Sequence, residues 1–156
     1  GYTLHTTLMR PKSRGSVTLQ SADPYQAPAI DPGFFTHPDD MAVAIKGARM
    51  GFEILEAKAM APYRGKRLHP FDVNDDKAME AFLRATCDTE YHPVGTCKMG
   101  PDTDPMAVVD AQLRVKGVQN LRVVDASIMP ALTTGNTNAP SMVIGEKAAD
   151  LIRSGA

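Results

Sequence analysis

The sequence has 156 residues, 43% of them hydrophobic and 22% charged, which predicts one packed domain rather than a disordered chain. A formal net charge of -1 excludes a surface built mainly to neutralise phosphates, so nucleic acid is not expected as a partner. The sequence contains no apolar run of about 18 residues, so no transmembrane segment is predicted, and no signal peptide is visible. Two cysteines favour a reducing compartment; we expect a cytoplasmic protein and leave association with a membrane surface open.

The chain opens with a pattern typical of β-structure. Residues 2–8 alternate between two faces and predict a half-buried strand, and residues 16–20 predict a second strand. The two strands together suggest a hairpin around an exposed basic loop. Residues 22–35, which contain three prolines, predict an extended connector.

Two helices are predicted next. Apolar residues recur at three- and four-residue steps over residues 37–58, and Thr36 offers a capping hydroxyl in front of them. A shorter helix is expected over roughly residues 75–87, with Asn74 as its cap.

The remainder combines loops, short strands and a final helix. Glycine and proline predict a loop over residues 88–106. Three short strands are then expected at "AVVD", "QLRV" and "LRVVD", with a turn at "KGVQN" between the last two. An irregular segment after Asp125 leads into a helix over residues 139–153.

The stretch "YHPVGTCKMG" leaves several kinds of site open. His92 and Cys97 suggest zinc, but the other cysteine and the other histidines lack ligand spacing, so no metal site is predicted. A nucleophilic Cys97 with His92 as its base is a second alternative, and a purely structural histidine is a third. Pro93 restrains the backbone of His92, and Gly95 permits a close approach, which favours an imidazole aimed as a general base.

The later stretch "TTGNTNAPSM" stands directly before the final helix. Asn138 has an ordinary interpretation as the helix N-cap, which leaves Asn136 and Gly135 unexplained. The free N–H groups and partial positive charge of the helix start would suit an anionic group or an electron-rich heterocycle oxygen.

Several blocks of the sequence resemble one family. They are "GYTLHTTLMRPKSRGSVTL", "IDPGFF", "YHPVGTCKMG", "LRVVDASIMP" and "GNTNAPSMVIGEKAADLI". In this order they resemble the C-terminal part of the glucose–methanol–choline (GMC) oxidoreductases, which are FAD-dependent, and in particular the choline dehydrogenase-like branch.

The resemblance implies a role for six residues. His92 corresponds to the family's catalytic base, and Asn136 to its second catalytic position. Thr137 and Asn138 match the segment near the flavin pyrimidine edge, and Asp125 and Ala126 match a turn that contacts the cofactor.

The resemblance also implies an α+β fragment of a longer protein. Residues 1–90 would belong to an antiparallel-sheet substrate-binding domain, and residues 91–156 would supply the last strands and helix of a Rossmann-like FAD-binding domain. The G-x-G-x-x-G fingerprint that binds the pyrophosphate is missing, and Gly1 replaces a start methionine. FAD is therefore expected in the full-length protein and not in this fragment, which should be inactive.

The function expected from the resemblance is oxidation of a primary alcohol, choline or another, with oxygen, a quinone or a carrier as the final electron acceptor. The alternative is an inactive interaction module that buries its open surfaces by forming a homo-oligomer.

Overall fold

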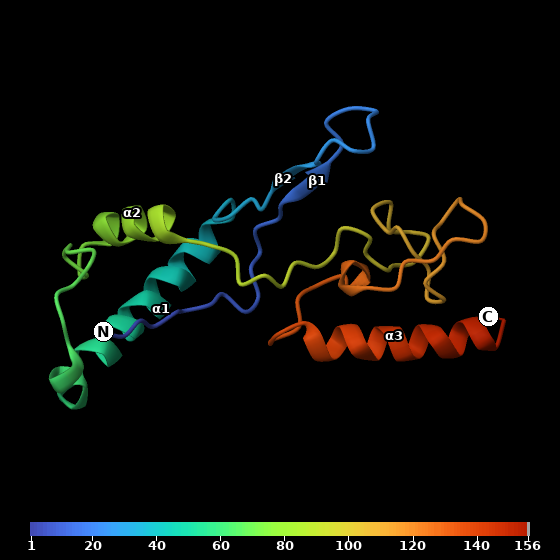
Figure 1. Ribbon diagram of the computed structural model, residues 1–156. Helices are drawn as coiled ribbons and strands as arrows, with labels where there is room; N and C mark the ends of the chain where they lie inside the picture. Colours follow the sequence, from blue (N-terminus) through green and yellow to red (C-terminus); the bar gives the residue numbers. More distant parts are fainter. Residues whose placement is uncertain (156) are drawn as a thin grey trace. The chain divides into compact units, whose positions relative to one another are not determined.

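The computed structural model describes residues 1–155, and the chain divides into two compact units, Gly1–Glu90 and Tyr91–Ala156 (Figure 1). The elements of the first unit are β1 (Ser16–Thr18), β2 (Ala29–Asp31), α1 (Pro38–Glu56), the 3-10 helix η1 (Lys58–Tyr63) and α2 (Asp76–Thr86). Those of the second are the 3-10 helix η2 (Ala126–Ile128) and α3 (Asn138–Arg153). The predicted α+β class is therefore confirmed.

The small sheet of the first unit differs from the prediction. β1 pairs in antiparallel register with β2, so that Ser16 faces Asp31, and β2 lies inside the segment expected to be a connector. The prediction of a strand over residues 2–8, and of its hairpin with residues 16–20, is wrong.

Residues 2–8 run beside α1 instead (Figure 1). The hydroxyl of Tyr2 donates to the carbonyl of Leu55 at 2.8 Å. A Cβ placed on Gly51 would lie 3.0 Å from the side chain of Leu4, so this segment approaches the helix closely where a glycine allows it. Alternation along the sequence correctly indicated that one side is covered, but a helix rather than a strand covers it.

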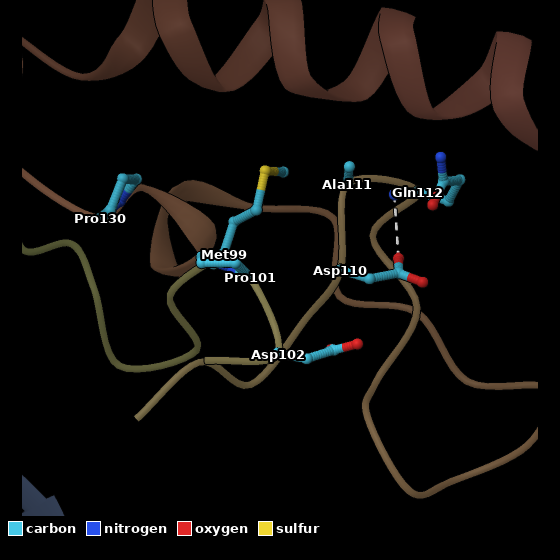
Figure 2. Close-up of a pocket in the computed structure, with 8 residues that line it drawn as sticks. Met99, Pro101, Asp102, Asp110, Ala111, Gln112 and Pro130 are labelled. Carbon is cyan, nitrogen blue, oxygen red and sulfur yellow. Dashed lines mark hydrogen bonds between the residues drawn. The ribbon is translucent and has the colours of Figure 1, made fainter. Parts of the chain in front are cut away.

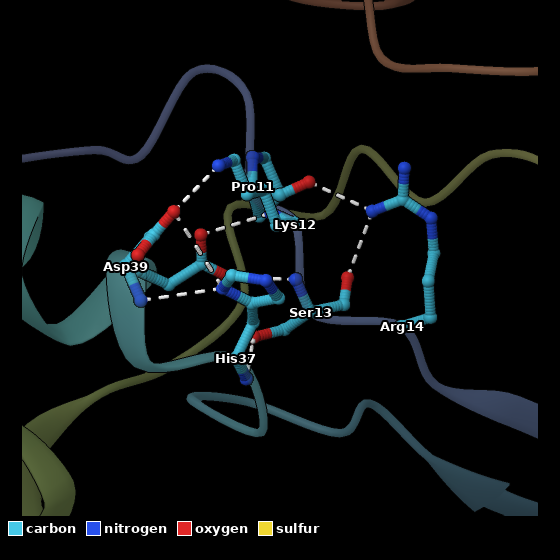
Figure 3. A network of polar contacts seen from close by, with 7 residues as sticks. Pro11, Lys12, Ser13, Arg14, His37 and Asp39 are labelled. Atoms are coloured by element: carbon cyan, nitrogen blue, oxygen red, sulfur yellow. Dashed lines mark hydrogen bonds and ion pairs between the residues drawn. The ribbon is translucent and has the colours of Figure 1, made fainter.

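The start of α1 is held by the segment that precedes β1 (Figure 3). Asp40 is 4% exposed, and its two carboxylate oxygens accept hydrogen bonds from the backbone N–H groups of Lys12 at 2.9 Å and Ser13 at 2.7 Å. Burial alone would raise the pKa of Asp40, but the hydrogen bonds from Lys12 and Ser13 outweigh it and hold that pKa below its usual value. The side chain of Lys12 also pairs with Asp39.

Both predicted helices of the first unit are confirmed, each with a cap one residue later than expected. His37, not Thr36, caps α1 through Nδ1, which accepts from the N–H of Asp39 at 3.2 Å. The hydroxyl of Thr36 donates to Gly33 instead and closes the preceding turn. Asp75, not Asn74, caps α2 because its carboxylate accepts from the first-turn N–H groups.

Helices α1 and α2 pack through an aromatic cluster. Phe52 of α1 lies 6.0 Å from Phe82 of α2, and Phe71 stacks on Phe82 with ring centroids 4.8 Å apart. Arg67 lies over Phe52 at 4.8 Å, and Met79 is fully buried. Aromatic pairs of this kind contribute stabilisation beyond that of the apolar area they bury, so they favour this pairing of the two helices.

The second unit has a small core of its own. It consists of Val109, Leu113, Ile128 and Ala148, of which Ala148 comes from α3 and Ile128 from η2. The three strands predicted between residues 107 and 125 appear only as isolated bridges, such as Val109 with Val115. The predicted turn at residues 116–120 is present, with positive φ at Gly117 and Asn120.

Candidate active site

The loop that carries His92 is fastened to η2 by backbone hydrogen bonds. The N–H groups of Gly95 and Cys97 both donate to the carbonyl of Ser127, at 3.1 and 3.0 Å. The N–H of Met99 donates to the carbonyl of Ile128 at 2.8 Å. Because Ile128 is also a core residue, these hydrogen bonds hold the loop in a fixed position relative to the core of the second unit.

Two backbone features of this loop explain its composition. Gly95 has φ of +92°, and a Cβ there would lie 3.5 Å from the carbonyl oxygen of Met129. The positive φ favours glycine, whereas the 3.5 Å distance is an ordinary van der Waals contact, so the close approach predicted from the sequence is not what requires glycine here. Tyr91, immediately before His92, has φ of +60°, which is uncommon for an aromatic residue. The backbone conformation is thus unusual both just before His92 and three residues after it.

The imidazole of His92 is contacted at both ring nitrogens by neighbouring residues of one loop. The side-chain nitrogen of Asn136 lies 2.8 Å from Nε2, and the hydroxyl of Thr137 lies 3.1 Å from Nδ1. The structure therefore brings together His92 and Asn136, which are 44 positions apart in the sequence, as the motifs suggested. Asn136 is exposed, whereas Thr137 is 7% exposed.

The contact from the Thr137 side chain was missed by the sequence analysis, which considered only its backbone. Thr137 is the N-cap residue of α3, and Asn138 is the first helical residue, so the N-cap interpretation of Asn138 is wrong. The Thr137 side chain makes no capping hydrogen bond. A detectable signal was Pro140, which stands at the third helical position where an N-cap side chain often finds its N–H donor.

The start of α3 tests whether these residues fit a flavin. The N–H groups of Asn138 and Ala139 have no acceptor within the helix, both residues are exposed, and no acidic residue occupies the first turn. The donors and the partial positive charge fit the electron-rich edge of an isoalloxazine ring. Gly135, just before them, has open space around the position of a Cβ. The chain therefore fits the ring end of FAD.

Asp125 and Ala126, the other two predicted cofactor residues, form the start of η2. The carboxylate of Asp125 accepts a hydrogen bond from the N–H of Ser127 at 2.7 Å and thereby caps η2. This contact gives Asp125 a structural role, because η2 supplies the carbonyls that hold the His92 loop. A cofactor contact by either residue stays a prediction.

Cys97 lies in the same loop as His92 but is not paired with it. Both ring nitrogens of His92 are engaged by Asn136 and Thr137, which leaves the thiol without the base that a nucleophilic cysteine requires. Within residues 1–155 no group of three or more histidine, cysteine or acidic side chains could hold a metal ion. The same part of the chain contains no helix long and apolar enough to cross a membrane.

The second unit also contains an open cavity of about 750 Å³ (Figure 2). Its lining consists of Met99, Gly100, Pro101, Asp102, Asp110, Ala111, Gln112 and Pro130. Asp110 accepts from the N–H of Gln112 at 2.9 Å and pairs with Arg114, and Asp102 pairs with Lys116. Since both carboxylates have partners and neither His92 nor Asn136 lines it, this cavity is not the candidate active site.

Comparison with known proteins identifies the class to which this fold and site belong. Residues 11–145 match a model of the C-terminal domain described as GMC oxidoreductase. That match covers most of the chain, and the chain therefore belongs to the GMC oxidoreductase family.

The individual relatives are similar over nearly the whole chain. Mitochondrial choline dehydrogenase of Mus musculus is 49% identical over 153 residues, which cover 97% of this chain and 26% of that protein. An alcohol dehydrogenase [acceptor] of Pseudomonas putida is 47% identical over 153 residues, 97% of this chain and 27% of that protein. A formate oxidase of Aspergillus oryzae, studied for modification of its FAD, superposes with a TM-score of 0.87 at 33% identity, over 94% of this chain and 26% of that one. The chain spans about a quarter of the length of these proteins.

Proposed function

We propose that this chain acts as the C-terminal, base-carrying part of an FAD-dependent oxidoreductase that converts a primary alcohol to an aldehyde. The observation that carries the proposal is the engagement of His92 by Asn136 at 2.8 Å beside the uncapped start of α3. Membership in a family whose relatives include choline and alcohol dehydrogenases supports the reaction class.

FAD, when bound, would accept the hydride from the carbinol carbon at N5. Nε2 of His92 would take the hydroxyl proton as that hydride leaves. The amide of Asn136 is exposed, so it can turn from the ring toward a substrate oxygen and fix its orientation. The free N–H groups at the start of α3 would stabilise negative charge that develops in front of them.

The finer assignments remain part of the proposal. Residues 1–90 would belong to the substrate-binding domain, and residues 91–156 would complete the FAD-binding domain. The substrate would be choline or another primary alcohol, and oxygen, a quinone or a protein carrier would reoxidise the cofactor. We propose a cytoplasmic protein that associates with a membrane surface in some settings and that forms a homo-oligomer.

The base assignment is tested by His92→Ala in the full-length protein with its best alcohol. We expect the rate of anaerobic flavin reduction to fall by about 10²–10⁴, which is the usual contribution of a general base. The control is Cys97→Ser in the same loop, which should keep the rate. A loss of less than about tenfold for His92→Ala contradicts the assignment, and a large loss for Cys97→Ser revives the thiol alternative.

A second test uses the chain by itself. The fragment lacks the G-x-G-x-x-G turn that would bind the pyrophosphate of FAD, so the isolated 156-residue chain should bind no FAD and oxidise no alcohol. The measurement is the visible absorption spectrum after incubation with FAD and gel filtration. A retained flavin spectrum would refute this expectation. An upstream coding sequence without that glycine motif would instead favour the inactive interaction module.

A further inference from the structure

The hydroxyl of Thr137 contacts His92 and does not cap α3, and Pro140 removes one of the two N–H groups that would compete for it. In an ordinary helix start, the side chain of a threonine N-cap accepts from the N–H of the second or third helical residue. In α3 the third helical residue is Pro140, which has no N–H. The hydroxyl of Thr137 makes no capping bond and lies 3.1 Å from Nδ1 of His92.

The contact at the other nitrogen indicates which ring nitrogen carries the proton. The nitrogen of the Asn136 side chain carries two hydrogens and accepts none, so Nε2 of His92, 2.8 Å away, must be the acceptor. A neutral imidazole with a bare Nε2 carries its hydrogen on Nδ1. Nδ1–H then donates to the hydroxyl oxygen of Thr137, which completes a consistent set of donors and acceptors.

We infer that Thr137 is a positioning residue that, together with Asn136, holds His92 in the Nδ1–H tautomer with Nε2 unprotonated, and that Pro140 favours the Thr137 contact. The inference rests on the proposed function for the use of Nε2 as a base, but the tautomer itself does not. When Nε2 has taken the proton, the hydroxyl of Thr137 still accepts from Nδ1–H, so the same contact serves the ring in both protonation states.

Burial strengthens the case for a specific contact. Thr137 is 7% exposed, so water cannot easily replace its hydroxyl at Nδ1. The backbone carbonyl of the same residue accepts from both the N–H and the hydroxyl of Ser141, at 3.0 and 2.7 Å. Thr137 is therefore fixed by the helix through its main chain while its side chain serves the histidine.

The experiment compares three variants of the full-length protein with bound FAD. Thr137→Val keeps the shape and removes the hydroxyl, Thr137→Ser keeps the hydroxyl, and Pro140→Ala restores an N–H that competes for it. The tautomer of His92 is read by ¹⁵N solid-state NMR with ring-labelled histidine, and its signals are assigned by their loss in His92→Gln. The rate of anaerobic flavin reduction is measured in parallel.

We expect the parent protein and Thr137→Ser to show a protonated Nδ1 and a bare Nε2. Thr137→Val should shift the ring toward the Nε2–H tautomer and slow flavin reduction about tenfold, as expected for one lost hydrogen bond to a group that becomes charged. Pro140→Ala should fall between the two. An unchanged tautomer in Thr137→Val, or equal losses in Thr137→Val and Thr137→Ser, overturns the inference. Neither outcome touches the base assignment, which falls only if His92→Ala keeps its rate.

Discussion

The two long helices of this protein begin in opposite ways. α1 starts with a proline at its first position, a His37 ring that accepts from the N–H of Asp39, and two acidic residues in its first turn. α3 carries its proline at the third position, has no acid in its first turn, and leaves the side chain of its N-cap uncommitted to the helix.

Under the proposed function, the difference separates a helix start that serves stability from one that serves chemistry. At α1 the cap accepts from a helix N–H, and the two acids complement the positive end of the dipole while they also hold the segment before β1. At α3 no side chain caps the first N–H groups and no acid faces the positive end of the dipole, and the hydroxyl of Thr137 contacts His92 instead. A helix start that is left incomplete can act on something outside the helix, at a cost in local stability.

The largest expected effect comes from the open helix start. Asn136→Ala in the full-length protein should lower the rate of flavin reduction by about 10²-fold or more, because it removes the amide that contacts His92 and that is proposed to turn toward the substrate oxygen. Thr134→Ala is the matched control, because Thr134 is an exposed residue of the same loop to which the proposal gives no role. Stopped-flow reduction without oxygen measures both. Equal rates for the two variants would remove Asn136 from the catalytic assignment.

A smaller effect is expected at the satisfied helix start, and on stability rather than rate. Asp40→Asn replaces one of two accepting oxygens by a donor that faces a backbone N–H, so the local free energy of unfolding should fall by about 1.5–3 kcal/mol. Hydrogen exchange in the first turn of α1 measures it, and flavin reduction should be unchanged.

The same carboxylate gives this region a defined pH dependence. The pKa of Asp40 is lower in the folded protein than in the unfolded chain, so its contribution is present above the unfolded pKa and is lost as the pH falls through the folded pKa. Protection of this turn should therefore decline in acid for the parent protein. A decline of the same size in Asp40→Asn would show that another group is responsible.

The smallest effect tests the comparison directly by making α3 resemble α1. Ala139→Glu places an acid in the first turn of α3, which should stabilise the helix by about 0.3–1 kcal/mol. The new charge also faces the region where negative charge is proposed to develop, so flavin reduction should slow. Ala139→Gln is the neutral control. If the glutamate variant is both more stable and equally fast, the helix start has no electrostatic role in the reaction.

The sequence predicted the helices well because their apolar spacing reflects burial directly. Their caps were displaced because several polar residues in a row compete for the same donors: Thr36 was expected at α1, but His37 takes that place. The strand over residues 2–8 failed for a different reason. Alternation records that one face is covered and does not say whether a strand or a helix covers it.

The site was predicted unevenly. His92 and Asn136 stood out through unusual neighbours and a family resemblance, and the structure places them in contact. The Thr137 side chain was missed because a threonine before a helix has an ordinary explanation as a cap. Only the combination with Pro140 argues against that explanation, and it requires knowing which residue is the N-cap. The carbonyls of residues 127 and 128 hold the His92 loop through backbone hydrogen bonds, which no pattern of side chains in the sequence could have predicted.

The small core of the second unit has a consequence for engineering. Ile128 packs in that core and its carbonyl fixes the His92 loop, while Ala148 anchors in the same core the helix that begins beside Asn136 and Thr137. His92, Asn136 and Thr137 are thus all positioned by the same small core. We expect substitutions that repack this core to shift the imidazole slightly without changing any residue around it. Such substitutions would change the proposed activity in graded steps, whereas substitutions in the candidate active site remove groups outright.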